Sequence, residues 1–162
     1  MKMSEGVEWT AHACVLLATL PPGSGLPASA LAEFHALAPA YMAKHMQALA
    51  RAGVVESLRG PAGGYRLGRP AKEISLWDIV VAIEGDERTF QCTEIRQQGP
   101  CGGSPHDFRK PCGIHAVFNK AEAAWRAELK SVSIADLANS TATKTSPQRR
   151  AALTEWLDKK LS

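Results

Sequence analysis

The spacing of apolar residues in the first third of the chain predicts three helices in close succession. Over residues 7–19, apolar side chains recur at intervals of three and four, which is typical of a helix face packed on a core. A Pro/Gly-rich stretch ends this helix. A second, short helix is expected over 27–37 and a third over 39–52, with a proline at its first position. The tight connection between the second and third helices indicates a helix-turn-helix.

A β-hairpin is expected directly after the third helix. Val54–Arg59 is rich in β-forming residues, a glycine-rich turn follows, and Tyr65–Leu67 starts a return strand that Pro70 ends. In this position a hairpin is typical of the wing of a winged-helix domain. A fourth helix is expected over 75–84, with Ser75 as its N-cap.

The amino-acid composition changes after the fourth helix. Residues 85–111 are rich in glycine and proline and contain Cys92 and Cys101, while Cys112 stands at the exit. Long loops without secondary structure are usually functional or disordered. The three cysteines in and beside the segment 85–111 favour a functional loop over a disordered one.

The next segment, 112–132, is predicted to be helical, with an apolar repeat of seven residues that favours pairing with a helix of a second copy of the chain. A polar stretch at 139–148 leads to a last short amphipathic helix. The expected fold is therefore mainly α with a small β-hairpin wing, a winged helix-turn-helix domain plus a long dimerisation helix. The expected division is a DNA-binding domain over 1–84, a cluster-binding loop over 85–111, a dimerisation helix over 112–138, and a polar linker with a C-terminal helix over 139–162.

The composition adds modest constraints. The 162 residues carry a formal net charge of +3, which permits nucleic-acid binding without arguing for it, because clustering of charge matters more than its sum. No apolar run approaches the ~20 residues of a membrane span, and the start lacks the apolar stretch of a secretory signal. A cytoplasmic protein with no membrane partner is expected, in which the four cysteines are ligands or reactive thiols rather than disulfides.

Candidate DNA contacts lie on the third helix and on the hairpin. Side chains that reach base edges, together with cations for phosphates, are what a recognition helix needs. The order of helix, tight turn, helix and glycine-rich hairpin favours this interpretation over an ordinary solvated helix face. The candidates are Tyr41, Lys44, His45, Gln47 and Arg51 on the helix, with Arg59, Arg66 and Arg69 on the hairpin.

The loop cysteines are spaced C-x8-C-x10-C, which fits no standard zinc finger. Thiolates are soft ligands that suit iron–sulfur clusters, copper(I) or zinc. Cys14 lies on the apolar stripe of the first helix and is expected to be a core residue. Glu8 and His12 stand four residues apart on that helix and leave the same face. Taken alone, His12 is better interpreted as a histidine satisfied by packing.

The stretch "PAYMAKHMQALARAGVVESLRGPAGGYRLGRPAKEISLWDIVVAIEG" resembles the winged-helix core of the Rrf-type bacterial transcription regulators, which include IscR, NsrR and RsrR. The resemblance spans roughly residues 1–135. One departure is Ala38, where the family often has a serine, a better N-cap. The resemblance implies a homodimer that binds a double-stranded DNA operator, with the recognition helix in a major groove and the wing toward the neighbouring minor groove.

Three ligand sets are compatible with this resemblance. The IscR pattern uses three cysteines and a histidine around 2Fe–2S, and the NsrR pattern uses three cysteines and an acid of the partner's first helix around 4Fe–4S. The RsrR pattern uses two cysteines of one subunit with a glutamate and a histidine of the other. The stretches "GVEW-x-x-H" and "CTEIRQ-x-GP" most resemble the third pattern. In residues of this chain, the three sets are Cys92, Cys101, Cys112 and His115; Cys92, Cys101, Cys112 and Glu8; and the favoured Cys92, Cys112, Glu8 and His12 around 2Fe–2S.

The function expected from this resemblance is a dimeric, DNA-binding transcription regulator that senses redox state or nitric oxide through an iron–sulfur cluster. Trp9 and His35 are expected to couple the cluster to the DNA-reading helices. The alternatives are a cluster-free regulator that responds to thiol oxidation or a ligand, and an iron–sulfur electron carrier. An enzyme is not expected, since the sequence offers no nucleotide-binding loop and no nucleophile–base pair.

Overall fold

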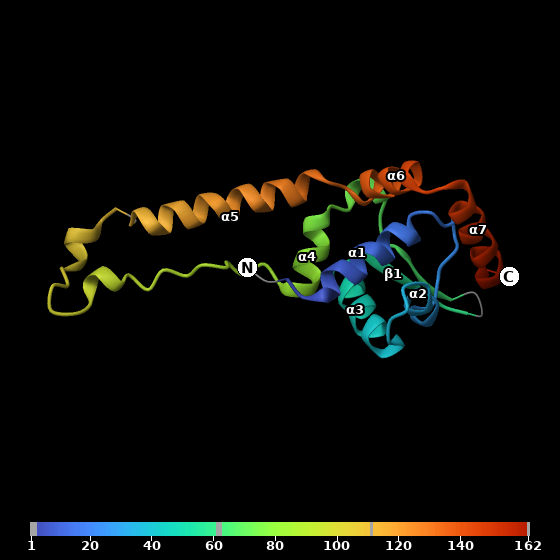
Figure 1. The fold of residues 1–162 in the computed structure, drawn as a ribbon. Helices are drawn as coiled ribbons and strands as arrows, with labels where there is room; N and C mark the ends of the chain where they lie inside the picture. The colour runs from blue at the N-terminus through green and yellow to red at the C-terminus, as the bar shows by residue number, and fades with distance from the viewer. Residues whose placement is uncertain (1–2, 61–62, 111, 162) are drawn as a thin grey trace. The chain divides into compact units, whose positions relative to one another are not determined.

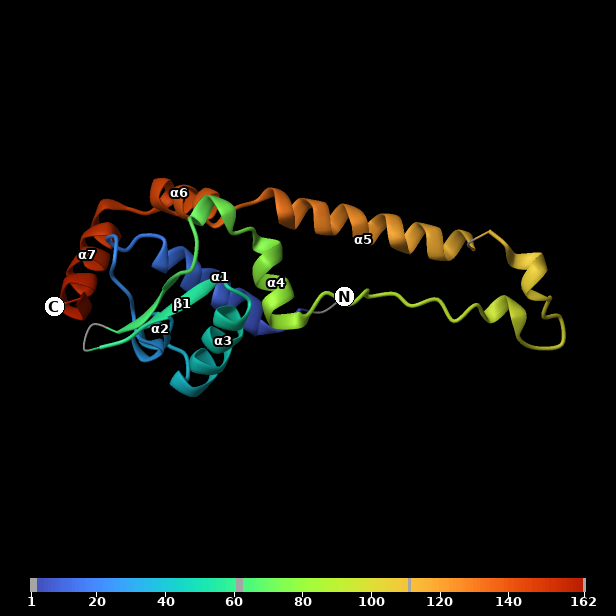
Figure 2. The same cartoon turned by 180° about the vertical axis from the view of Figure 1, so that it is seen from behind.

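A computed structural model describes residues 3–60, 63–110 and 112–161 (Figures 1 and 2). The described residues form seven α-helices and one antiparallel hairpin, with short 3-10 turns at 71–73, 95–97 and 105–108. The mainly helical fold with a hairpin wing is therefore confirmed. The bounds are α1 Glu5–Leu17, α2 Ala28–Phe34, α3 Pro39–Arg51, β1 Val55–Leu58, β2 Gly64–Leu67, α4 Leu76–Glu84, α5 Gly113–Ser131, α6 Ile134–Lys144 and α7 Pro147–Leu161.

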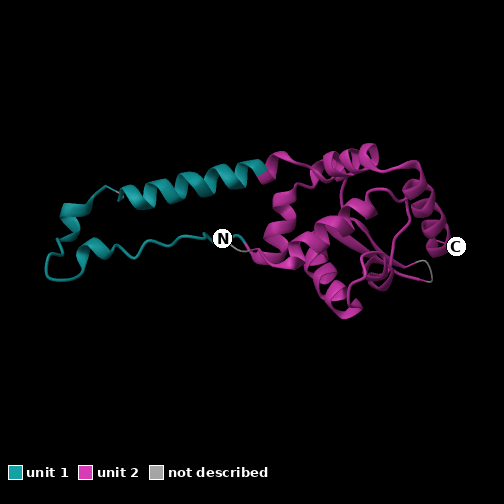
Figure 3. Cartoon of the chain, in the orientation of Figure 1, with its two compact units in different colours: residues 1, 86–128 teal, residues 2–85, 129–162 magenta. Residues whose placement is uncertain are grey.

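The chain forms two compact units (Figure 3). The loop–helix unit comprises residues 86–128, that is the cysteine loop and most of α5. The large unit comprises the described residues of 2–85 and 129–162 and contains the helix-turn-helix, the hairpin, α6 and α7. The C-terminal helices thus belong to the same unit as the expected DNA-binding elements.

The core of the large unit lies among α1, α2, α3, α4 and the hairpin. Burial of apolar side chains from every one of these elements provides the main stabilisation of the fold. The expected core position Cys14 is confirmed, because its side chain is fully buried. The largest fully buried side chains include Leu26, Leu31, Met42, Met46, Leu49, Ile74, Ile79 and Ile134.

The hairpin pairs Val55 with Leu67 at its base and Leu58 with Gly64 near its turn. Leu26 extends this pairing, because its backbone amide donates to the Tyr65 carbonyl at 3.0 Å and its carbonyl accepts from Tyr65 at 2.8 Å. The segment before α2 is therefore anchored on the wing. The turn residues 61 and 62, expected at the wing tip, lie outside the described residues.

The helix predicted over 112–132 is confirmed as α5, whereas the polar stretch over 139–148, expected as a linker, is largely helical. Helix α5 ends at Ser131, α6 covers most of that polar stretch, and α7 begins at Pro147. The break has a local cause, because Ser133 and Asp136 form a reciprocal capping box that starts a new helix. Two backbone hydrogen bonds also hold this segment in a non-helical conformation. The Leu76 amide donates to the Val132 carbonyl, and the Ile134 amide donates to the Ile74 carbonyl.

Helix α7 packs on α2, the first helix of the helix-turn-helix. The rings of Trp156 and Phe34 lie 4.9 Å apart, and the Trp156 indole N–H donates to Glu33 at 3.3 Å. Lys160 forms an ion pair with the other Glu33 oxygen at 2.7 Å. The C-terminal helix thereby covers the outer side of α2. In the part of the chain that is described, no helix is both long enough and apolar enough to cross a membrane.

Candidate functional site

The outer face of α3 carries the expected base-reading side chains. Tyr41, Lys44, Gln47 and Arg51 are exposed and recur at intervals of three or four residues, so they form one solvent-facing stripe. The opposite face of α3 is buried. This helix therefore presents a polar and cationic surface of the kind that enters a major groove.

His45 differs from the other candidates on α3, because it is half-buried against α1. Its ring lies 6.0 Å from the indole of Trp9, edge to face. A Cβ added to Gly6 would come within 2.5 Å of the His45 ring, so the glycine makes room for it. Burial, and then the charge of Lys44, lower the pKa of His45 below its ordinary value. At neutral pH this imidazole is therefore uncharged and contacts α1.

The hairpin arginines have different surroundings. Arg59 is exposed near the wing tip. Arg66 forms a cross-strand ion pair with Glu56 at 2.5 Å. Arg69 pairs with Asp78 at 3.1 Å and donates to the Glu73 carbonyl, so it fastens the end of the hairpin to α4. Of the three, Arg59 is the one with a free guanidinium in the described chain.

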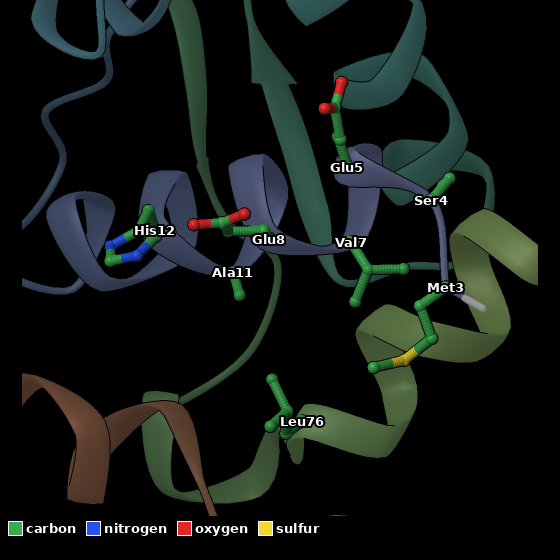
Figure 4. Close-up of a pocket in the computed structure, with 8 residues that line it drawn as sticks. All are labelled: Met3, Ser4, Glu5, Val7, Glu8, Ala11, His12 and Leu76. Carbon is green, nitrogen blue, oxygen red and sulfur yellow. The ribbon is translucent and has the colours of Figure 1, made fainter. Parts of the chain in front are cut away.

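Glu8 and His12 project side by side from α1 (Figure 4). Both side chains are exposed, and neither forms a hydrogen bond or an ion pair with another described residue. They border a groove of about 390 Å³ whose apolar part comes from Met3, Val7 and Leu76, where α1 faces the start of α4. The carboxylate and the imidazole are thus free to bind a group from outside this unit.

A second, smaller cavity of about 280 Å³ adjoins the same two side chains. Trp9, His35 and Leu37 complete its lining. The His35 ring lies 5.8 Å from that of His12, and its buried Nε2 has no hydrogen-bond partner in the described chain. Burial, together with the nearby His12, lowers the pKa of His35 below its ordinary value. The cavity therefore holds a polar atom without a hydrogen-bond partner in the described chain, the His35 Nε2, near the side chains of Glu8 and His12.

The four cysteines fall into two groups. Cys14 is enclosed in the core, and burial raises its thiol pKa to about 12, so it is inert. Cys92 and Cys101 are exposed, and Cys112 is half-buried. The Cys112 sulfur accepts a hydrogen bond from the His115 backbone at 3.3 Å, at the first turn of α5. All three loop thiols, including Cys101 outside the favoured ligand set, are therefore at least partly accessible.

Within the described ranges of this single chain, no three His, Cys, Asp or Glu side chains gather closely enough to hold a metal ion. The favoured ligand set draws Glu8 and His12 from one subunit and the cysteines from another, so it stays a prediction. In the loop–helix unit, the His115 Nε2 faces the amide of Asn119 at 2.7 Å. The other ring nitrogen of His115, Nδ1, is buried and has no hydrogen-bond partner in the described chain.

The contact between α1 and α3 was not foreseen from sequence. Trp9 was expected to be a coupling residue, but its partners Tyr41 and His45 were expected to contact DNA alone. The signal for this contact lay in Gly6, a helix-breaking residue inside the first turn of an otherwise regular helix. A small residue there indicates close approach by a neighbouring side chain.

Comparisons with known proteins agree with this description. The profile of the Rrf2 family, described as "Iron-dependent Transcriptional regulator", matches residues 3–140. YffB of Lactococcus lactis subsp. lactis, named among the HTH-type transcriptional regulators, is 31% identical over 98% of both chains. NsrR of Bacillus subtilis, also named an HTH-type regulator, is 28% identical over 85% of this chain and 90% of its own.

Solved structures share the fold. CymR, the global cysteine regulator of B. subtilis, has a TM-score of 0.70 at 23% identity, and the match covers 87% of this chain and 98% of CymR. IscR of T. potens has a TM-score of 0.67 at 22% identity, over 90% of this chain and 93% of its own. At these identities the likeness concerns the fold alone.

Proposed function

This chain belongs to the Rrf2 family of transcriptional regulators, and we propose that it is a dimeric redox sensor that binds its operator through α3 and the wing. The main support is a contact between two helices. Trp9 on α1, which follows the candidate ligand Glu8, contacts Tyr41 and His45 on the recognition helix α3. The candidate sensing site and the DNA-reading surface thus share a direct contact.

The dimer part of the proposal rests on the exposed apolar face of α5. Ile114, Val117 and Phe118 have 66%, 69% and 49% of their surface exposed. Phe118 also stacks on Phe90 of the cysteine loop, with ring centroids 4.4 Å apart. Large exposed apolar groups at helical spacing favour a partner helix, and a second copy of α5 supplies one.

The donor set fits a 2Fe–2S cluster held between two subunits. Two accessible thiols, Cys92 and Cys112, supply the sulfur ligands, and the partner subunit supplies a carboxylate and an imidazole from Glu8 and His12. All four donors are exposed or half-buried, and Glu8 and His12 have no competing hydrogen bond in the described chain. Replacement of two thiolates by such ligands is compatible with cluster binding, because histidine ligation of an iron–sulfur cluster is well precedented.

When bound, the cluster supplies a one-electron change of charge. The carboxylate of Glu8 and the imidazole of His12 are then next to a centre whose charge differs between the two redox states. His35, whose Nε2 has no hydrogen-bond partner in the described chain, lies beside His12. Trp9 transmits any shift of α1 to Tyr41 on α3. A sensor of this kind works only if the two states differ in affinity for DNA.

Two measurements on anaerobically purified protein test the proposal. Visible absorption with an iron and sulfide count establishes whether a cluster is present. Footprinting on DNA upstream of the protein's own gene then gives affinities for oxidised, reduced and metal-free protein. Different affinities in the three states are expected. Equal affinities would refute the sensing part and leave the DNA-binding part intact.

A cluster-free regulator that senses thiol oxidation is the second candidate. It is favoured by the exposure of Cys92 and Cys101 in one loop, where both thiols are open to oxidants. Colourless anaerobic protein whose DNA affinity changes on treatment with peroxide supports this candidate. An electron carrier is a weaker alternative, because it does not require the recognition helix. In either regulatory role we place the protein in the cytoplasm, where the operator is.

A further inference from the structure

One side chain in the cysteine loop ties both ends of that loop together. The Arg96 Nε and Nη2 donate to the two carboxylate oxygens of Glu94 at 2.5 and 2.8 Å. The same Nη2 donates to the backbone carbonyl of Lys110 at 3.3 Å. Glu94 lies two residues after Cys92, and Lys110 lies two residues before Cys112. A single guanidinium therefore bridges the two cysteine-bearing flanks.

Other contacts of the loop converge on the same residue. The Arg96 guanidinium carbon lies 4.6 Å from the centre of the Phe108 ring. The Arg96 carbonyl accepts from the backbone of Gly103 at 3.3 Å. Arg96 is thus contacted by three separate parts of a loop that otherwise has little regular structure.

The backbone at Glu94 adds an independent observation. Its φ is 50°, in the left-handed region that L-residues with a Cβ seldom adopt. Such a conformation persists when the surroundings over-determine it. Two kinds of contact surround it: the Glu94 carbonyl accepts from the Gln97 amide at 3.0 Å, and the guanidinium fork of Arg96 engages both carboxylate oxygens.

Arg96 places a positive charge between the two segments that carry the candidate ligand sulfurs. Hydrogen bonds to Glu94 raise the pKa of the Arg96 guanidinium above its ordinary value, and the charges of the Cys112 and Cys92 thiolates raise it further. Both sulfurs thus lie within electrostatic range of this cation. A positive charge between the two flanks attracts anionic groups that approach them.

We propose that Arg96 is a positioning residue that holds Cys92 and Cys112 as a pair beside a positive charge, so that one chain presents a two-sulfur half-site for a thiophilic metal centre. This inference rests on the proposed function, because the half-site is the cysteine half of the proposed ligand set. It assigns to a residue outside that set the task of keeping the loop closed before a second subunit contributes ligands.

Closure of this loop by Arg96 has a thermodynamic consequence. Nineteen residues separate Cys92 from Cys112, and a flexible segment of that length keeps its ends together only against its own conformational entropy. Contacts that close the loop in the metal-free protein remove that cost from ligand binding. Lysine retains the charge of Arg96 but lacks the planar fork, so it replaces only part of this role.

The test uses metal-free, reduced full-length protein with Cys101→Ala in every variant, so that Cys92 and Cys112 are the accessible thiols. The probe is dibromobimane, which becomes fluorescent when two neighbouring thiolates displace both bromides. Peptide mass spectrometry identifies the bridged pair, and a denaturing gel shows whether the bridge lies within one chain. Arg109→Gln is the matched control, because the Arg109 side chain contacts His106 and not Glu94.

The expected result is a bridge between Cys92 and Cys112 within one chain, formed at equal rates in the parent and in Arg109→Gln. Arg96→Gln is expected to slow it about tenfold, as loss of a charge-assisted hydrogen bond implies. Arg96→Lys is expected to give an intermediate rate. Equal rates for Arg96→Gln and Arg109→Gln, or bridges formed only between chains, would overturn the proposal.

A second readout separates the charge of Arg96 from a purely structural role. The rate of thiol modification is compared for an anionic disulfide reagent, 5,5′-dithiobis(2-nitrobenzoate), and a neutral one, 4,4′-dithiodipyridine. The anionic-to-neutral ratio is expected to fall in Arg96→Gln and to be retained in Arg96→Lys. A ratio that is the same in both variants would contradict a role for the charge.

These experiments are independent of cluster loading. Colourless native protein with bridging that depends on Arg96 refutes the proposed cluster and supports the half-site. Coloured protein with bridging that does not depend on Arg96 supports the cluster and refutes the assignment of Arg96.

Discussion

The indole of Trp9 on α1 meets the ring of Tyr41 on α3 edge to face, with centroids 6.2 Å apart and planes at 78°. This contact joins the helix that carries Glu8 and His12 to the helix that reads DNA. We predict that Trp9→Leu leaves cluster binding and unfolding stability nearly unchanged but brings the operator affinities of oxidised and reduced protein together. The measurement is footprinting in both redox states.

Trp156→Phe is the control for this prediction. That indole contacts Phe34 on α2 and Glu33, and neither α1 nor α3 is among the described partners of its ring. The Trp156→Phe variant is expected to keep the difference in operator affinity between the oxidised and reduced protein. If Trp9→Leu keeps the difference as well, the coupling does not pass through the contact with Tyr41.

The ligand set gives a spectroscopic prediction. Cys92→Ala, Cys112→Ala and His12→Ala are each expected to abolish or markedly change the visible absorption of anaerobically purified protein, since each removes a ligand. Cys101→Ala is expected to leave the spectrum unchanged. A bleached Cys101→Ala protein beside an unchanged His12→Ala protein would point to an IscR-type or NsrR-type set instead.

Local signals were sufficient to predict most of the fold. Apolar spacing located α1, and a proline at its first position located α3. The capping pair of Ser75 and Asp78 located the start of α4, and glycines located the hairpin turn. The apolar repeat correctly gave the extent of α5, but the second capping box, at Ser133, was not recognised as the start of another helix. Backbone pairing with residues 74–76 reinforces the break there, and this long-range interaction is one that no local pattern reveals.

The site was less predictable than the fold. The apolar stripe correctly placed Cys14 in the core, and four-residue spacing correctly placed Glu8 and His12 side by side. The partial burial of His45 against α1 was not predicted. Neither were the contacts that Arg96 makes with Glu94, Phe108 and Lys110. The first depends on a contact between two helices distant in sequence. The second depends on contacts within one loop, and an arginine in a polar loop carries no pattern that separates it from a solvated one.

Gly6→Ala tests the close approach of α1 and α3. The new methyl group would lie 2.5 Å from the His45 ring, so that side chain must move while the backbone stays. Alanine in a helix is favoured over glycine by about 1 kcal/mol, which offsets the cost of the displaced ring. We expect near-normal stability in urea unfolding and at least about a threefold loss of operator affinity, of the order that moving one contact residue produces.

The conservative control at the same contact is His45→Gln, which removes the ring that Gly6→Ala displaces. In the double variant the two losses of affinity should not add, because residues in direct contact couple. Additive losses would show that the glycine acts on DNA binding by another route.

Cys14 gives a pH prediction. Burial raises its thiol pKa from 9.0 to about 12, so the folded state holds the proton more tightly than the unfolded chain. The stabilisation is complete below pH 9.0 and is lost as the pH rises toward 12, at up to about 1.4 kcal/mol per pH unit. The stability advantage of the parent over Cys14→Ala should therefore shrink between pH 9 and 11 in urea unfolding. A constant difference would contradict it.

Helix α7 allows two contributions to stability to be compared. Trp156 is half-buried against Phe34, whereas the ion pair of Lys160 with Glu33 has side chains 31% and 56% exposed. Burial of a large apolar ring is worth about 1–2 kcal/mol when partial, and an exposed ion pair is worth about 0–1 kcal/mol. We predict that Trp156→Ala lowers the free energy of unfolding by about 1–2 kcal/mol and Lys160→Met by less than about 1 kcal/mol. Urea unfolding at low and high salt measures both, and only the smaller effect should depend on salt. A larger loss in Lys160→Met would mean that charge, and not ring packing, holds α7 on α2.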